Sequence, residues 1–190
     1  IQLGQVVRED GPESHLAKRG TPTMGGSLII FAVVLSTVMW ADPSNTFTLL
    51  ASLLTAGYAV IGFVDDFLKV KRKSSGGLSG KLKLAFQFAI AIAVVMALYA
   101  SDAIPEPIRY RLALPFLDFY EYEFVLHPAI YTAFSVIVIV GASNAVNLTD
   151  GLDGLAIGPV IISAGTFLFL TYAAGTLIAG FDIARYLNIP

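Results

Sequence analysis

Two short segments of this sequence are rich in acidic and amide residues. Residues 144–154 read Asn-Ala-Val-Asn-Leu-Thr-Asp-Gly-Leu-Asp-Gly, and Asp65 and Asp66 form an adjacent acidic pair. Carboxylate and amide oxygens suit a hard divalent cation, which keeps coordination sites for phosphate oxygens. Amides can also bind the edge of a nucleobase or a sugar. The two segments therefore predict a site for a metal ion and phosphates.

Long uncharged runs surround these segments and must position them. Apolar residues make up 56% of the 190 residues and charged residues only 14%. No Asp, Glu, Lys or Arg occurs in residues 20–41, 43–64, 84–101, 124–149 or 154–181. A helix needs about 20 apolar residues to cross a bilayer, with a range of about 17–25. Long solid runs also differ from the short alternating segments of membrane barrels.

The chain is therefore predicted to be an all-α, polytopic helical membrane protein with five transmembrane helices. We expect residues 1–190 to form a single integral membrane domain rather than a very hydrophobic soluble bundle. The expected cores of the five spans are residues 23–41, 47–64, 84–99, 129–146 and 155–179.

Basic residues are concentrated on one side of these spans. Connecting segments 1–22, 65–83 and 147–154 hold nine of the 12 lysines and arginines. Segments 42–46, 100–128 and 180–190, on the other side, hold the remaining three. Cytoplasmic loops carry an excess of Lys and Arg, so the first set is predicted to be cytoplasmic and the second periplasmic. The amino terminus is then cytoplasmic.

The longer periplasmic segment shows a strand-like pattern. Apolar side chains alternate over residues 108–114 and again over 120–124, with Pro115 between them. This alternation predicts a short hairpin on the periplasmic surface.

The acidic pair is expected at the carboxyl-terminal end of the second span. The helix dipole disfavours anions there, and a cation would relieve both this penalty and the repulsion between the two carboxylates. Adjacent helical residues point about 100° apart, so Asp65 and Asp66 should take different roles. One would face a metal ion or nucleophile and the other a lysine. A solvated acidic pair balanced by Lys69 and Lys71 is an equally weighted alternative.

The segment 144–154 is the more specific signal. Asn144 and Asn147 are three residues apart, so they share a helix face at the cytoplasmic end of the fourth span. Asp150 and Asp153 follow in a glycine-containing turn, where backbone can approach a ligand closely. Helix capping would explain Asp153 but not the other three residues. Polar groups at a membrane boundary are costly, which favours a functional interpretation.

Two further cytoplasmic segments are rich in basic residues. Residues 18–26 read Lys-Arg-Gly-Thr-Pro-Thr-Met-Gly-Gly and lead into the first span. The free backbone N–H groups at the amino-terminal end of that helix would favour an anion. Taken alone, this pattern is better explained as a flexible helix entry, and it is not a Walker loop. The lysines of residues 69–83 serve as topology signals and lipid contacts, or they hold a lipid phosphate. We expect the cytoplasmic polar segments to converge on one pocket.

Three motifs resemble a known family. They are His-Leu-Ala-Lys-Arg-Gly-Thr-Pro-Thr-Met-Gly-Gly, Phe-Val-Asp-Asp-Phe and Asn-Ala-Val-Asn-Leu-Thr-Asp-Gly-Leu-Asp-Gly-Leu-Ala. They resemble the phospho-N-acetylmuramoyl-pentapeptide-transferases, which belong to the polyprenyl-phosphate N-acetylhexosamine-1-phosphate transferase family. The resemblance covers essentially the whole chain.

The resemblance implies an enzyme, an Mg²⁺-dependent phosphoglycosyl transferase. It would transfer phospho-N-acetylmuramoyl-pentapeptide from its UDP conjugate to undecaprenyl phosphate, giving lipid I and UMP. This is the first membrane step of bacterial peptidoglycan synthesis. The implied location is the bacterial inner membrane, with the active site facing the cytoplasm. The implied partners are these two substrates and the lipid bilayer, without nucleic acid, and a homodimer is possible.

Site residues follow from the resemblance by position. The pair Asp65 and Asp66 matches the family's catalytic aspartates, and Asp153 is assigned to catalysis as well. Residues matching the nucleotide-sugar site are Lys18, Thr23, Asn144, Asn147, Asp150 and Asp153. Asp65, Asp66 and Asn144 are the expected metal ligands.

The resemblance also implies that this chain is a portion of a longer protein. The family has about ten spans, whereas five are predicted here. The family's first helix, a further essential aspartate and a histidine-rich cytoplasmic loop have no counterpart in the sequence. We therefore expect the chain to be inactive alone.

Two other functions compete with this assignment. A sister enzyme transfers N-acetylglucosamine-1-phosphate, but it is less similar in the Thr-Pro-Thr-Met-Gly-Gly and Asn-Leu-Thr-Asp segments. A transporter or flippase would place polar residues near the span centres, where they mark an ion path. The acids here gather at one surface instead, which favours an interfacial enzyme.

Overall fold

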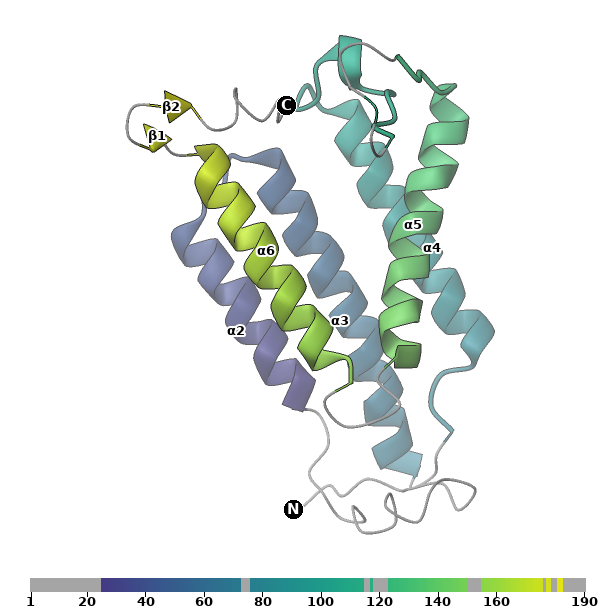
Figure 1. The fold of residues 1–190 in the computed structure, drawn as a ribbon. Helices are drawn as coiled ribbons and strands as arrows, with labels where there is room; N and C mark the ends of the chain where they lie inside the picture. The colour runs from purple at the N-terminus through teal and green to yellow at the C-terminus, as the bar shows by residue number, and fades with distance from the viewer. Residues whose placement is uncertain are drawn as a thin grey trace. The chain divides into compact units, whose positions relative to one another are not determined.

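Helices dominate the fold (Figure 1). The computed structural model describes residues 25–72, 76–114, 117, 123–149, 155–175, 177–178 and 181–182. Its α-helices are α2 (Gly25–Trp40), α3 (Thr46–Arg72), α4 (Gly80–Ala100), α5 (Pro128–Thr149) and α6 (Ile157–Gly175). Short elements are the 3-10 helix η1 (Glu106–Ile108) and the strands β1 (Leu177–Ile178) and β2 (Phe181–Asp182).

Five apolar helices correspond to the five expected spans. In the part of the chain that the structure describes, α3, α4 and α5 are long and apolar enough to cross a membrane. The apolar stretches of α2 and α6 are shorter. The 16 residues of α2, for example, rise about 24 Å, against the roughly 30 Å of a hydrocarbon core. The prediction of an all-α polytopic membrane fold is confirmed.

The chain divides into two compact units, residues 1–140 and residues 141–190. In the first unit, α2 and α3 form a helical hairpin closed by a tight turn. Asp42 Oδ1 accepts hydrogen bonds from the Ser44 backbone N–H at 2.9 Å and from the Ser44 hydroxyl at 2.6 Å. These bonds lower the pKa of the exposed Asp42 carboxyl group. Asn45 Oδ1 accepts from Thr48 N at 3.1 Å and so caps the start of α3.

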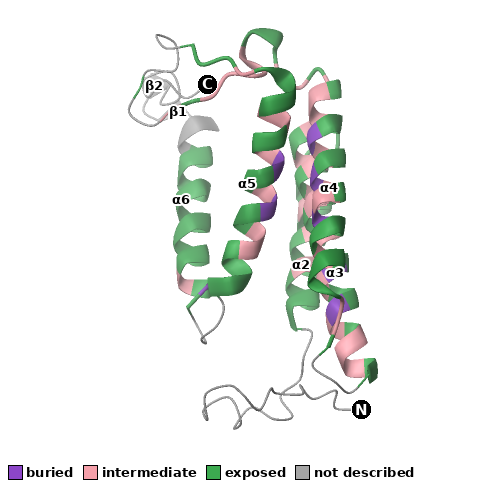
Figure 2. Cartoon of the chain, turned by 90° about the vertical axis from the view of Figure 1, so that its right-hand side faces the viewer, coloured by how far each residue is buried: buried purple, intermediate pink, exposed green. Residues whose placement is uncertain are grey.

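A small apolar core lies between α4 and α5. Ala91 and Val95 of α4 meet Val136 and Val140 of α5, and all four are buried. Most other large apolar residues on the described helices are exposed, and these positions are green on the cartoon in Figure 2. In a membrane, lipid or further helices would cover these exposed residues. Small side chains at helix contacts allow two helices to approach closely.

The segment between α4 and α5 contains the start of the expected hairpin. Arg111 and Val125 form an isolated antiparallel bridge. Leu112 N donates to Phe124 O at 2.9 Å, and Leu126 N donates to Tyr110 O at 3.0 Å. The pairing confirms that this segment folds back on itself, although residues 115–116 and 118–122 lie outside the described part.

Three tyrosines attach this segment to the helices. Tyr110 stacks at an angle against Tyr99 of α4, with ring centroids 5.4 Å apart, and edge-on against Tyr131 of α5 at 6.1 Å. Tyr99 also donates to or accepts from Ser135 Oγ at 3.2 Å.

In the second unit, the last turns of α5 are followed by α6 and by the antiparallel pair β1–β2. Leu177 pairs with Asp182, and Ile178 pairs with Phe181. The helix of the fifth expected span, residues 155–179, therefore ends at Gly175, before these strands.

Candidate functional site

Four of the eight predicted site residues lie in described helices. Asp65 and Asp66 are in α3, and Asn144 and Asn147 are in α5. The other four, Lys18, Thr23, Asp150 and Asp153, lie outside the described residues, so their roles stay predictions.

The helix that holds the acidic pair is longer than expected. We expected the acids at the carboxyl-terminal end of the second span, but α3 continues beyond them to Arg72. Its last turns are basic, with Lys69, Lys71 and Arg72 after the acids. The expectation that the helix ends at these acids was wrong. The apolar pattern ends at residue 64, whereas the backbone hydrogen bonding of a helix does not depend on apolar side chains. Cations suit the helix carboxyl terminus, so the basic residues favour the continued helix.

Asp65 is buried between α3, α4 and the segment that joins them. Only 8% of the residue is exposed. Its Oδ1 accepts a hydrogen bond from Leu78 N at 2.8 Å, and Lys69 Nζ lies 2.7 Å from its Oδ2. Lys83, in the first turn of α4, lies 4.0 Å from the same oxygen. Each carboxylate oxygen thus has a partner within the protein, which offsets the cost of burial.

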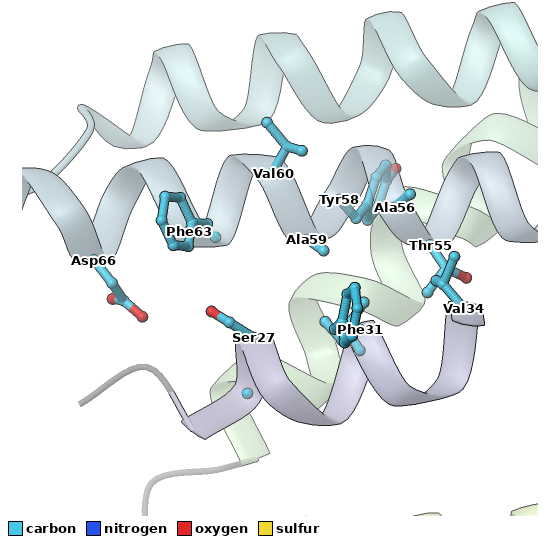
Figure 3. A pocket seen from close by; sticks show the side chains of 13 residues that line it. Ser27, Phe31, Val34, Thr55, Ala56, Tyr58, Ala59, Val60, Phe63 and Asp66 are labelled. Atoms are coloured by element: carbon cyan, nitrogen blue, oxygen red, sulfur yellow. The ribbon is translucent and has the colours of Figure 1, made fainter. Parts of the chain in front are cut away.

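Asp66 lies instead at one end of a pocket between α2 and α3. The pocket has a volume of about 620 Å³ and mostly apolar walls, including Phe31 of α2 and Tyr58 of α3. Figure 3 shows the side chains of Asp66 and Ser27 pointing toward one another at one end. The side chain of Asp66 is about half exposed. It is therefore accessible, whereas its neighbour is enclosed.

Lys69 connects the two acids. Its Nζ lies 3.1 Å from Asp66 Oδ1 and 2.7 Å from Asp65 Oδ2. The sequence spacing explains this contact, because residues three and four positions apart lie on the same side of a helix. The sequence predicts Lys69 as a balancing charge and as part of the basic loop, and Lys83 as part of the same loop. The i+3 and i+4 spacing could have identified Lys69, whereas only the tertiary structure brings Lys83 to Asp65.

No group of three or more His, Cys, Asp or Glu side chains comes together in the ranges that the structure describes. Asp66 fits as one ligand, since its carboxylate is accessible at the pocket. Asp65 fits less well, since its oxygens already bind a backbone N–H and a lysine.

Asn144 and Asn147 lie on consecutive turns at the end of α5. Both belong to the second unit, and Asn147 is exposed. Their three-residue spacing within a continuous helix confirms that they share a face. Whether they meet the acidic pair stays a prediction, as does the convergence of the cytoplasmic segments on one pocket.

Comparison with known families bears directly on this site. Residues 48–185 match the family described as Glycosyl transferase family 4, and this range contains the acidic pair and the Asn/Asp segment. The chain belongs to glycosyl transferase family 4. Residues 18–30 of this family member also match the phospho-N-acetylmuramoyl-pentapeptide-transferase signature 1, which confirms the resemblance of the amino-terminal motif.

Several similar proteins have the same name. The chain is 56% identical over 193 residues to a phospho-N-acetylmuramoyl-pentapeptide-transferase of Sorangium cellulosum, which covers 100% of this chain and 51% of the relative. It is 50% identical to the protein of that name from Syntrophus aciditrophicus, covering 100% of this chain and 50% of the relative. The protein from Ruegeria sp. is 48% identical over 98% of this chain and 49% of its own length. The chain therefore spans about half the length of the curated relatives it matches.

Proposed function

We propose that the protein to which this chain belongs transfers phospho-N-acetylmuramoyl-pentapeptide from its UDP conjugate to undecaprenyl phosphate. The products are lipid I and UMP. The strongest support is sequence identity of 56% and 50%, over the whole chain, with two relatives named phospho-N-acetylmuramoyl-pentapeptide-transferase. The signature in residues 18–30 supports the same substrate.

The proposed setting is the bacterial inner membrane, with the active site facing the cytoplasm. We propose that segments 1–22, 65–83 and 147–154 are cytoplasmic and that 42–46, 100–128 and 180–190 are periplasmic. The distribution of basic residues supports this orientation. The accessible carboxylate of Asp66 lies on the same helix as Lys69, Lys71 and Arg72, where a membrane-bound phosphate would meet basic side chains.

In the proposed reaction, the phosphate of the lipid attacks the β-phosphate of the nucleotide sugar. One acid of the 65–66 pair positions or deprotonates the lipid phosphate. Asn144, Asn147, Asp150 and Asp153 bind the nucleotide sugar together with Lys18 and Thr23. A lipid phosphate is already largely anionic near neutral pH, by analogy with phosphorylated side chains whose second pKa is about 6. Positioning should therefore matter more than proton removal.

Mg²⁺ is the proposed cofactor. Asp66 would supply one carboxylate ligand, with further ligands from the Asn/Asp segment. The ion, when bound, would neutralise charge on the departing UMP and orient the phosphates.

Transfer of N-acetylglucosamine-1-phosphate is the second candidate. It would use the same acidic pair and the same cation. The match to the pentapeptide-transferase signature favours the muramoyl substrate over this alternative. Release of UMP from each of the two nucleotide sugars separates the candidates.

The proposal is tested by mutation in the intact protein. Asp66→Asn and Asp153→Asn should each reduce Mg²⁺-dependent UMP release by about 100-fold or more, the scale of a lost positioning or acid–base group. Asp42→Asn is the matched control, since Asp42 is an exposed acid in the α2–α3 turn, and it should retain activity. Wild-type release by both site variants would contradict the assignment. Release only from the N-acetylglucosamine donor would favour the second candidate.

A further inference from the structure

The two acids of the pair have different surroundings although they are adjacent. Side chain exposure is 11% for Asp65 and 47% for Asp66. Because neighbouring helical residues point about 100° apart, one carboxylate faces α4 and its preceding segment while the other faces the pocket beside α2. A shared catalytic role for both carboxylates would require Asp65 to turn away from its present partners.

The backbone before α4 closes directly over Asp65. A Cβ atom added at Gly77 would lie 2.9 Å from Asp65 Cγ and 2.8 Å from its carbonyl oxygen. The next residue, Leu78, donates its N–H to the carboxylate at 2.8 Å. Glycine is therefore required here by close approach, and the carboxylate acts as the anchor to which this segment is attached.

We propose that Asp65 is a positioning residue, which fixes Lys69 and the backbone of Gly77 and Leu78, and that Asp66 is the acid which contacts the ligand. The first part stands on the contacts described above. The second part rests on the proposed function. The proposal specifies which acid takes which role, whereas the family resemblance treats the two residues as one catalytic pair.

The contact between Asp65 and the segment before α4 also affects two nearby lysines. Leu78 is followed by Ser79, whose hydroxyl caps α4 by accepting from Leu82 N at 3.4 Å. Lys83 lies in the first turn of the helix that begins there, and its ammonium group faces Asp65. Asp65 thus orients one lysine of α3 directly and one of α4 through the attached segment. Substituting it should displace both.

The anchor is tested by amide hydrogen exchange at Leu78 in the intact protein, reconstituted in lipid nanodiscs. Asp65→Ala removes the acceptor and should accelerate exchange of the Leu78 amide roughly tenfold to a hundredfold, as expected for a lost hydrogen bond to a charged group. Asp66→Ala is the matched control and should leave this exchange unchanged. An unchanged rate in Asp65→Ala, or equal acceleration in both variants, would overturn the proposal.

A milder variant covers the case in which Asp65→Ala does not fold. Asp65→Asn keeps an oxygen for Leu78 N–H but loses the negative charge, and neutral hydrogen bonds are roughly half as strong. Exchange at Leu78 should then be faster than in the wild-type protein and faster than in Asp66→Asn. Equal rates in the two asparagine variants would contradict the anchor.

The division of roles is tested by kinetics. Asp66→Asn should lower kcat for UMP release by about 100-fold or more. Since Asp65 acts through Lys69 and Lys83, adding Asp65→Asn to the double variant Lys69→Gln/Lys83→Gln should cause no further loss of kcat. Additive losses in kcat would show that Asp65 contacts the ligand itself. If the wild-type protein releases no UMP from either donor, the proposed function fails, while the exchange rates still decide whether Asp65 is the anchor.

Discussion

Asp65 and Asp66, which both contact Lys69, show how two adjacent carboxylates on one helix can have different surroundings. Adjacent positions were expected to take different roles, with one acid facing a lysine. In the structure Lys69 reaches both acids, and burial distinguishes them instead. The equally weighted alternative, a solvated pair balanced by lysines, does not describe Asp65, because Leu78 and Gly77 enclose its side chain.

Gly77 offers a test of this close packing at the scale of one methyl group. Gly77→Ala should reduce the free energy of unfolding by about 1–3 kcal/mol, the usual cost of overpacking, because the new Cβ would press on Asp65. Gly80→Ala is the control, since nothing lies within 4 Å of an added Cβ there. Thermal unfolding in mild detergent measures both. A melting temperature for Gly77→Ala equal to that of Gly80→Ala would contradict the described contact.

At the scale of elements, the contact between α4 and α5 illustrates packing without a hydrophobic driving force. Lipid is as apolar as the side chains, so helices in a membrane associate by close van der Waals contact. Ala91 is completely buried and shares a cluster with Val95 of α4 and with Val136 and Val140 of α5. A small residue at this position lets the two helices approach.

Enlarging Ala91 should therefore separate the two helices. Ala91→Leu is expected to cost about 1–3 kcal/mol of unfolding free energy, measured by denaturation in mixed micelles. Ala93→Leu makes the same change at an exposed position of the same helix. It should have little effect. Equal destabilisation by the two substitutions would show that the effect comes from the helix itself rather than from the contact with α5.

At the scale of the whole molecule, the arrangement in the membrane determines whether the polar segments can cooperate. The chain spans about half the length of its relatives and divides into two units. The acidic pair lies in one unit and the Asn/Asp segment in the other. Their cooperation requires both to face the same side of the bilayer, which the distribution of lysine and arginine predicts.

Cysteine labelling tests that sidedness directly. The 190 residues contain no cysteine, so single cysteines introduced into this chain report on their own positions. Ser44→Cys, in the α2–α3 turn, should react with a membrane-impermeant thiol reagent added from the periplasmic side. Gly76→Cys, before α4, should react only after the cytoplasmic side is opened. Labelling of both from one side would contradict the orientation.

Much of the fold follows from local patterns in the sequence. The uncharged runs located the five α-helices that the structure describes, because a helix satisfies its own backbone hydrogen bonds in lipid. The same reasoning placed the end of the second span at residue 64. It missed the continuation of α3 to Arg72, because hydropathy reports where lipid ends rather than where a helix ends.

For the candidate site, the sequence by itself determined the residue types, the Asn144/Asn147 helix face and the family motifs. Only the tertiary structure decided that Asp65 is enclosed and that Asp66 opens to the pocket. The reason is physical: side chain direction within α3 is set by helix geometry, but burial depends on what packs against each direction. The backbone of Gly77 and Leu78 comes from a segment more than three helical turns away along the chain, and no periodicity within α3 specifies where that segment folds back.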